Sequence, residues 1–328
     1  SLNNPIYALT GTELKNLQYD PRRLEIGEYL RQPNHNFARG QSAQNTIAPE
    51  LKGTMRRCES CHDAEGIHNT WLPYTDRHLD ELACEGCHIP KLYAPTVQSY
   101  DWTVLNASAQ PLSTCRGVDG NSNTIRDLVT GFAPVLMPRE NIDGKVLLAP
   151  YNLITAWYWI YDSNNGSRPV RLADLQAAYF DGGRYAQDIL QALDADGNGD
   201  LSESELTLDT PAKQAVVASR LAALGLKNPR IVGEIQPYSV NHNVAGGKWA
   251  VKECKTCHNE SSLITQPIKL ADKLPGGVMP EFVKGTNTLS SGNLSTENGV
   301  LYYRPATRGQ QLYIFGHDRV EWVDWLGA

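Results

Sequence analysis

The feature that most constrains this chain is a five-residue pattern, Cys-x-x-Cys-His, which occurs three times in 328 residues. The copies occupy residues 58–62, 84–88 and 254–258. With 7 Cys and 8 His in the chain, chance alone predicts roughly 0.004 matches to this pattern. The repeated spacing therefore indicates one shared chemistry, the covalent attachment of c-type haem.

Haem attachment uses all three fixed positions of the pattern. The two thiols form thioether bonds with the haem vinyl groups, and the adjacent histidine becomes the proximal ligand of the iron. The predicted attachment residues are Cys58, Cys61, His62, Cys84, Cys87, His88, Cys254, Cys257 and His258. The predicted cofactors are thus three covalent haems.

Paired cysteines also suit a zinc ion, a redox-active dithiol or a structural disulfide. The four cysteines of the first two copies could form one tetrahedral zinc site. That interpretation leaves a histidine unexplained after each pair and leaves the pair in 254–258 without partners. Haem is therefore favoured, and Cys115 is the one cysteine outside the motifs.

Charge and hydropathy narrow the range of partners and of cellular compartments that suit this chain. The formal net charge is −6, and haem propionates add negative charge, whereas nucleic-acid binding needs a basic face. No nucleic-acid partner is therefore expected. The longest apolar run, residues 146–161, is interrupted by Pro150 and Asn152 and is too short to span a bilayer. Because covalent haem is attached outside the bacterial cytoplasm, a periplasmic or extracellular location is predicted.

The sixth ligand of each iron separates electron carriers from enzymes. Two strong axial ligands favour electron transfer, whereas an open position favours substrate binding. Five histidines lie outside the motifs, more than three irons need: His35, His68, His78, His242 and His317. His35, His78 and His242 rank highest because each lies just upstream of a motif, and His68 and His317 follow closely.

Methionine and lysine are rival ligands. The chain has only Met55, Met137 and Met279, and Met55 is too near Cys58 to reach over its own haem easily. Lys248 is a weaker candidate. Bis-histidine coordination is therefore predicted, with low reduction potentials compared with Met/His haems. Which histidine serves which iron stays open.

A weak internal repeat supports two of these histidines. The pattern Asn-His-Asn-(Phe/Val)-Ala-x-Gly fits residues 34–40 and residues 241–247. It places one histidine upstream of the first motif and one upstream of the third, in matching local contexts.

Residues 194–205 fit the twelve-residue EF-hand calcium loop. Gly199 occupies the sharp-turn position, Leu201 the apolar position and Ser202 a position that can hold a water. The predicted oxygen ligands are Asp194, Asp196, Asn198, Asp200 and Glu205. An acidic solvent-facing loop is the alternative. Since the nearest candidate mate, residues 162–167, lacks the closing Glu, a structural Ca²⁺ site is predicted rather than a sensor.

Apolar spacing predicts mostly helices. Residues 77–83 are expected to run as a helix directly into the second motif, and 91–150 to form loops with a few short strands. Leu153, Ile154, Trp157 and Ile160 predict a further helix, as do 172–180 and 185–193. Thr210 and Pro211 begin a helix that Gly225 ends. The predicted fold class is mainly α with extensive irregular loops.

The motifs divide the chain into three predicted regions. Residues 1–110 carry two haems, residues 111–240 form a loop-rich part followed by a helical insert with the calcium loop, and residues 241–328 carry the third haem and an aromatic C-terminal segment.

Clustered Cys-x-x-Cys-His motifs with interspersed histidines resemble multihaem c-type cytochromes. Residues 78–88 resemble the haem-packing segments of the octahaem tetrathionate reductase and hydroxylamine oxidoreductase group, and the resemblance covers 35–88 and 242–258. It implies a multihaem cytochrome c architecture. That group has more haems and a distinctive catalytic one, and the Cys-x-x-Cys-Lys motif of pentahaem nitrite reductases is absent here.

Filament-forming multihaem cytochromes are similar in their low content of regular structure and their bis-histidine haems. In them a histidine can bind iron across a subunit interface, a role that would suit His35 or His317. Redox proteins, other cytochrome subunits or further copies of this chain are therefore the expected partners.

Three functions follow, of which electron transfer through closely packed haems is favoured over an enzyme. The second is an oxidoreductase acting on a small nitrogen or sulfur species at one open haem. The third is the haem subunit of a membrane quinol-oxidising complex, in which residues 322–328 could precede a membrane segment.

Overall fold

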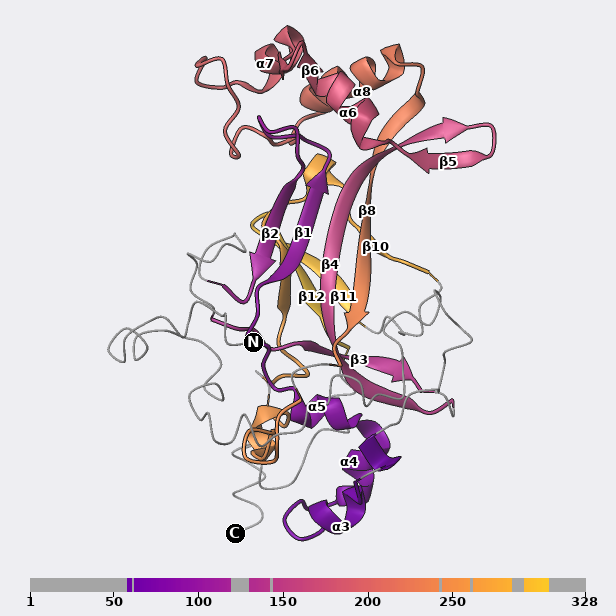
Figure 1. Ribbon diagram of the computed structural model, residues 1–328, viewed down its shortest axis with the longest axis vertical. Coiled ribbons are helices and arrows are strands. Elements are labelled where there is room, and N and C mark those ends of the chain that lie inside the picture. The colour runs from indigo at the N-terminus through magenta and orange to yellow at the C-terminus, as the bar shows by residue number, and fades with distance from the viewer. Residues whose placement is uncertain are drawn as a thin grey trace, which may run out of the picture.

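The computed structural model describes residues 58–60, 62–118, 130–141, 144–241, 244–259, 262–284 and 292–306. Of these residues, 24% are helical and 35% lie in strands, so the prediction of a mainly α fold is wrong. Figure 1 shows a central β-sheet with helices α6, α7 and α8 at one end and α3, α4 and α5 at the other. The motif-bearing segments occupy the second of these ends.

The main sheet has seven strands in the order β10-β8-β4-β1-β2, with β3 and β5 also paired to β4. β1 pairs with β4, and β10 with β8, in parallel, while the other pairs are antiparallel. Its strands are β1 (Thr96–Trp102), β2 (Leu112–Arg116), β3 (Val135–Glu140), β4 (Val146–Ser163), β5 (Gly166–Pro169), β8 (Lys227–Ser239) and β10 (Glu281–Phe282). All three predicted regions contribute strands to it, and the division into those regions stays a prediction.

The segment expected to be a helix after residue 151 is instead the long strand β4. Leu153, Thr155, Trp157 and Trp159 alternate along it and are all buried, which is the period of a strand rather than of a helix. The segment is rich in aromatic and β-branched side chains, which favour pleated sheet. Its partner β8, for which no strand was expected, pairs with it over most of its length.

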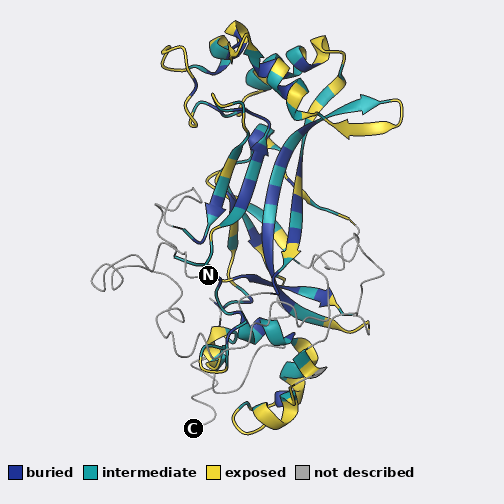
Figure 2. Cartoon of the chain, viewed as in Figure 1, coloured by how far each residue is buried: buried dark blue, intermediate teal, exposed yellow. Residues whose placement is uncertain are grey.

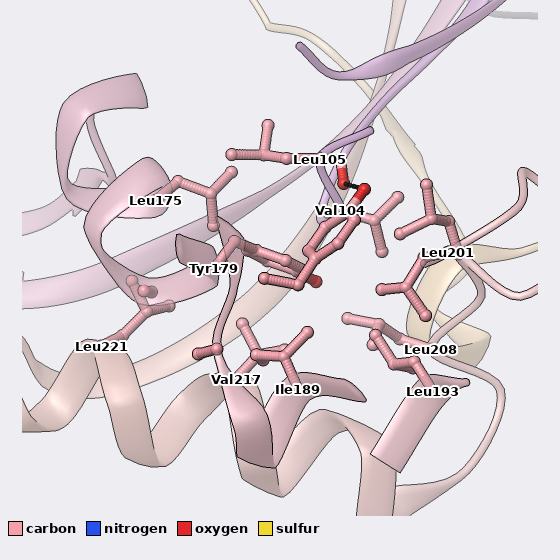
Figure 3. Close-up of a cluster of buried hydrophobic side chains, with 14 of the residues drawn as sticks. Val104, Leu105, Leu175, Tyr179, Ile189, Leu193, Leu201, Leu208, Val217 and Leu221 are labelled. Carbon is pink, nitrogen blue, oxygen red and sulfur yellow. Dashed lines mark hydrogen bonds between the residues drawn. The ribbon is translucent and has the colours of Figure 1, made fainter. Parts of the chain in front are cut away.

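The helices at the end of the sheet opposite the motifs, called the far end below, agree with the helices predicted from the sequence. They are α6 (Leu172–Tyr179), α7 (Gln187–Leu193) and α8 (Pro211–Ala223). The Thr210 hydroxyl caps α8 by accepting from the backbone N–H of Lys213, and Gly225 follows its end with a φ of 88°. Figure 3 shows Tyr179, Ile189, Val217 and Leu221 converging on Val104 and Leu105, which follow β1.

A second core lies between the main sheet and a three-stranded sheet in the order β11-β12-β9. Trp157 of β4 is buried here and donates from Nε1 to the carbonyl oxygen of Val278 at 2.8 Å. Figure 2 shows buried residues alternating with less buried ones along the central strands. The remaining elements are β6 (Phe180–Asp181), β7 (Arg184–Tyr185), β9 (Ile268–Ala271), η6 (Pro275–Gly277), β11 (Asn293–Glu297) and β12 (Val300–Arg304).

The motif end consists of short helical turns. They are η4 (Cys58–Ser60), α3 (Ala64–His68), α4 (Thr75–Glu81), α5 (Cys84–His88) and η5 (Cys254–Thr256). The helix expected to run directly into the second motif is broken, because Leu82 and Ala83 are extended. The N–H of Ala83 donates to the carbonyl oxygen of Leu148 at 2.9 Å. Pairing with β4 thus replaces a helical hydrogen bond and turns α5 relative to α4.

Among the described residues, every helix falls short of the length and apolar character that a bilayer crossing requires.

Candidate haem sites and calcium loop

The three motifs converge at one end of the sheet. The Cys84 thiol lies 3.5 Å from the Glu59 carboxylate, so the first two motifs are in contact. The Cys257 thiol of the third motif lies near Cys87, and burial, with a smaller contribution from the charge of Cys87, raises its pKa to about 12. Burial also raises the pKa of Cys87. Cys61 lies outside the described residues.

The sheet holds the second motif in place through a buried ion pair. Arg139 of β3 lies 3.5 Å from the Glu85 carboxylate of α5, and both side chains are largely buried. The same guanidinium donates to Ser239 Oγ at 2.8 Å and to Asn241 Oδ1 at 3.2 Å. Since Ser239 ends β8, the motif is fixed to two strands of the main sheet.

The chain upstream of the third motif is bound to the second motif. The Ala245 N–H donates to the carbonyl oxygen of His88 at 2.7 Å, and the Val251 N–H donates to that of Cys87 at 2.9 Å. In the other direction, His88 Nδ1 lies 2.8 Å from the carbonyl oxygen of Ala245. Three hydrogen bonds therefore join two motifs that are far apart in sequence.

Two histidines from the linker between the first two motifs face histidines of the motifs. His68 at the end of α3 and His88 have ring centroids 6.2 Å apart and ring planes at 88°. His78 of α4 and His258 have centroids 6.0 Å apart and planes at 86°. The structure thus brings together two predicted distal candidates and two predicted proximal ligands.

Both linker histidines are held by a carbonyl one helical turn earlier. His68 Nδ1 lies 2.6 Å from the Ala64 carbonyl oxygen, and His78 Nδ1 lies 3.1 Å from that of Tyr74. A carbonyl can only accept, so in each pair Nδ1 carries the hydrogen and Nε2 carries the lone pair. This is the tautomer that binds a metal through Nε2, with the other nitrogen fixed by a backbone oxygen. These supporting carbonyls were not predicted from the sequence, because the expected helix over 77–83 includes neither Ala64 nor Tyr74.

The surroundings of these histidines fit an apolar prosthetic group. Ile67, Trp71 and Tyr74 are 53%, 43% and 64% exposed, although all three are large and apolar or aromatic. The ring of Trp71 lies 5.8 Å from that of His68. Exposed large apolar side chains that are close in sequence to the candidate ligands suit an apolar group such as haem. The residues present therefore fit haem in both donor chemistry and surroundings.

The other predicted ligands are placed as follows. His35, His242, His317 and Met55 lie outside the described residues. Met137 is fully buried in the sheet core, and Met279 is exposed. Lys248 lies with its ammonium 5.1 Å from the centre of the Trp249 ring, and Cys115 is buried on β2.

The predicted calcium loop curls around its own carboxylates. Asp194 accepts from the N–H groups of Gly197 at 2.7 Å and Gly199 at 2.8 Å. Glu205 accepts from the N–H and hydroxyl of Ser202 and from the N–H of Ala195, and these bonds lower its pKa to about 2. Oxygen atoms of Asp194, Asp196 and Glu205 lie within 4.8 Å of one another. Three of the five predicted side chains thus converge as an EF-hand ligand set would.

Further details of the loop fit in part. Gly199 has a φ of 83°, the sharp turn that this position requires. Leu201 is buried in the core of the far-end helices. The side-chain oxygens of Asn198 and Asp200 accept hydrogen bonds from the backbone N–H groups of Asp200 and Leu201, respectively. Residues 203–205 form a turn, and the next helix, α8, begins at Pro211 as the sequence predicts.

Comparison with known proteins gives little further support. No protein-family model and no curated protein matches the chain. One solved structure that matches is described as an octaheme cytochrome c from Shewanella oneidensis, with a TM-score of 0.33 and 17% sequence identity. The match covers 62% of this chain and 48% of that one, so it spans about half the length of that cytochrome. A likeness at this level carries no argument, and the haem assignment depends on the motifs and on the geometry of their surroundings.

Proposed function

We propose that this protein carries three covalent haems and transfers electrons between them outside the cytoplasm. The observation that carries the proposal is the convergence of the three Cys-x-x-Cys-His segments. The chain just upstream of the third motif is joined to the second motif, since the N–H groups of Ala245 and Val251 donate to the carbonyl oxygens of His88 and Cys87 and His88 Nδ1 donates to that of Ala245, although most of the main sheet and the far-end helices lie between the two motifs in sequence. Close packing of haems is what an electron path needs.

In this function the haem supplies the one-electron redox chemistry. The chain supplies covalent anchors through its cysteines and axial ligands through its histidines. The sheet holds the second motif through the Arg139–Glu85 pair and the Ala83–Leu148 hydrogen bond, and the hydrogen bonds of Ala245 and Val251 hold the third-motif region beside it. Fixed separations favour electron transfer because neither the ligands nor the spacing must reorganise.

Histidines placed to bind two of the irons favour an electron carrier over an enzyme with an open haem. Strong ligands on both sides of an iron leave no position for a substrate. The ring pairs His68–His88 and His78–His258 support this proposal. The oxidoreductase and the quinol-oxidising subunit stay as alternatives without a structural observation that favours them.

The acidic chain suits basic redox partners, other cytochrome subunits or further copies of itself. The distal ligand of the haem on His62 would come from His35, His242 or His317, either within the chain or across a subunit interface. A filament with shared ligands is one form that this proposal allows.

We further propose that residues 194–205 bind Ca²⁺ as a structural element. The converging carboxylates, the turn at Gly199 and the buried Leu201 support a rigid oxygen site. It lies at the end of the sheet opposite the motifs (Figure 1), which suits a stabilising role at the far-end core rather than a direct effect on haem.

The haem proposal is tested on the protein purified from a host that attaches c-type haem. Intact mass is expected to exceed that of the polypeptide by three haems. The oxidised protein is expected to be low-spin, and the reduced protein to bind no carbon monoxide at equilibrium. Stoichiometric carbon monoxide binding would instead favour the oxidoreductase, and a mass without haem would exclude both functions.

A further inference from the structure

We infer that the linker between the first two motifs supplies the distal ligands of two haems: His68 for the iron on His88, and His78 for the iron on His258. This inference rests on the proposed function and goes beyond it by assigning named ligand pairs. A stretch of eleven residues, 68–78, would then supply the sixth ligand of two irons. The attachment sites of these two haems lie in different parts of the chain.

The ring separations fit opposite ligands of a single iron. Two imidazole nitrogens that bind one metal from opposite sides, each at about 2 Å, place their ring centroids roughly 6 Å apart. The observed separations are 6.2 Å for His68–His88 and 6.0 Å for His78–His258. Both centroid separations therefore match those of two imidazoles on one iron.

Edge-to-face contacts between aromatic rings fall in the same range of distance, so distance alone does not decide. Each of the two histidine pairs joins one motif histidine to one linker histidine. In three of the four rings, Nδ1 is bonded to a backbone carbonyl, of Ala64, Tyr74 or Ala245. Simple ring packing requires neither feature, whereas iron coordination through Nε2 requires the motif partner and is favoured by the fixed tautomer.

The assignment of His78 differs from what chain order suggests. His78 lies six residues before Cys84, yet its ring faces His258 rather than His88. The extended residues Leu82 and Ala83 separate α4 from α5, and Lys145 Nζ lies 2.5 Å from Asp80 Oδ1, which ties α4 to the start of β4. The break thus turns α4 toward the third motif and leaves His68 of α3 to face the second.

The pairing has a consequence for the electron path. The haems on His88 and His258 would share one ligand segment and would be joined by the hydrogen bonds of Ala245 and Val251 to the second motif. These two haems would therefore be held beside each other, although their attachment sites are far apart in sequence.

The test measures spin state and carbon monoxide binding for His68→Ala and His78→Ala. Each variant is expected to keep three haems by mass and to gain one high-spin ferric haem and one carbon monoxide site per chain. Added imidazole is expected to restore the low-spin spectrum. Arg77→Ala, an exposed neighbour of His78, is the control and is expected to leave all haems low-spin. If both histidine variants stay fully low-spin, the assignment is wrong.

A second background identifies which iron loses its ligand. In a chain with Cys254→Ala and Cys257→Ala, which removes the third attachment, His78→Ala is expected to add no high-spin haem, whereas His68→Ala still adds one. The reverse pattern would overturn the pairing. Should this background fail to fold, mapping of haem methyl shifts by NMR in each single variant identifies the affected haem. Carbon monoxide binding by the unsubstituted protein would instead count against the proposed function.

Discussion

His88 Nδ1 lies 2.8 Å from the carbonyl oxygen of Ala245, 157 residues further along the chain. The Ala245 N–H in turn donates to the carbonyl oxygen of His88 at 2.7 Å. The reciprocal pair fixes the ring of His88 and holds the third motif region beside the second. One local contact therefore sets both the orientation of a proposed iron ligand and the relation between two proposed haem sites.

Ala245→Pro is expected to raise the reduction potential of one haem. Proline removes the N–H that donates to His88 and displaces the carbonyl that accepts from Nδ1. A proximal imidazole without this partner is less basic and stabilises ferric iron less. The shift is expected on the order of tens of millivolts, where about 59 mV corresponds to a tenfold change. Potentiometric titration with optical detection measures it.

Gly247→Ala is the control for this change, because a Cβ there would meet no atom within 4 Å. It is expected to leave every potential unchanged. Equal potentials in Ala245→Pro and the unsubstituted protein would show that the hydrogen bond does not tune the haem.

Arg139→Met is expected to destabilise the protein by about 3 kcal/mol. The change leaves the Glu85 carboxylate largely buried and without its cation, and it removes the bonds to Ser239 and Asn241. Denaturant unfolding followed by circular dichroism gives the free energy of unfolding. Adding Glu85→Gln to Arg139→Met is expected to recover part of the loss, since the unpaired charge is gone.

An exposed ion pair serves as the comparison for Arg139. Arg171 lies 2.8 Å from Asp174, with an exposed guanidinium, and Arg171→Met is expected to lower the free energy of unfolding far less than Arg139→Met, because solvent screens an exposed pair. Similar losses for Arg139→Met and Arg171→Met would mean that burial of the Arg139 pair is energetically unimportant.

The sequence predicted local features of this chain better than its architecture. The haem assignment stays a prediction that depends on the motif spacing, and α8 was predicted correctly because Thr210 and Pro211 are local signals. β4 was mistaken for a helix because Leu153, Ile154, Trp157 and Ile160 fit a helical period by chance, while its true period of two appears in Leu153, Thr155, Trp157 and Trp159. Pairing with β8 decides between these patterns, and such pairing is not a local property.

The contrast between local signals and distant contacts also applies to the candidate iron ligands. His68 and His78 were recognised as candidates because histidine is scarce and clusters near the motifs. Their partners could not be assigned, since the break at Leu82 and Ala83 depends on Leu148, which is distant in sequence. The role of Arg139 was not expected, because a single arginine in a strand carries no signal of its contact with Glu85.

Removal of Ca²⁺ is expected to lower stability at the far-end core. Binding at a calcium concentration about one hundred times Kd adds about 2.7 kcal/mol to the free energy of unfolding. Thermal unfolding with and without a chelator measures this difference. Glu205→Gln is expected to abolish it, because the closing carboxylate is lost.

Glu203→Gln is the matched control, since Glu203 is exposed and lies outside the predicted ligand set. It is expected to respond to calcium as the unsubstituted chain does. Unfolding that is independent of calcium in all three proteins would show that residues 194–205 form only an acidic loop.

Asp101 is expected to make the protein less stable as pH rises. Its carboxylate is buried at the end of β1, accepts from the Thr103 N–H at 2.9 Å and hydroxyl at 2.5 Å, and lies 4.0 Å from Lys273 Nζ. Burial raises its pKa, although the bonds from Thr103 and the charge of Lys273 oppose the shift. The buried Tyr179 nearby has its own pKa raised, chiefly by burial and also by Asp101.

The direction of the pH effect follows from proton linkage. The folded state holds the proton of Asp101 more tightly than the unfolded state, whose pKa is about 3.9. Its contribution to stability is therefore complete below about pH 4 and is lost as pH rises through the pKa of Asp101 in the folded state.

Asp101→Asn keeps an oxygen that accepts from Thr103 and removes the charge. The free energy of unfolding of this variant is therefore expected to exceed that of the unsubstituted protein at pH 7 and to match it more closely at pH 4. Asp272→Asn, at an exposed position, is the control and is expected to leave the difference between the two pH values unchanged. A smaller gain at pH 7 than at pH 4 for Asp101→Asn would show that Lys273 and Thr103 outweigh burial at this carboxylate.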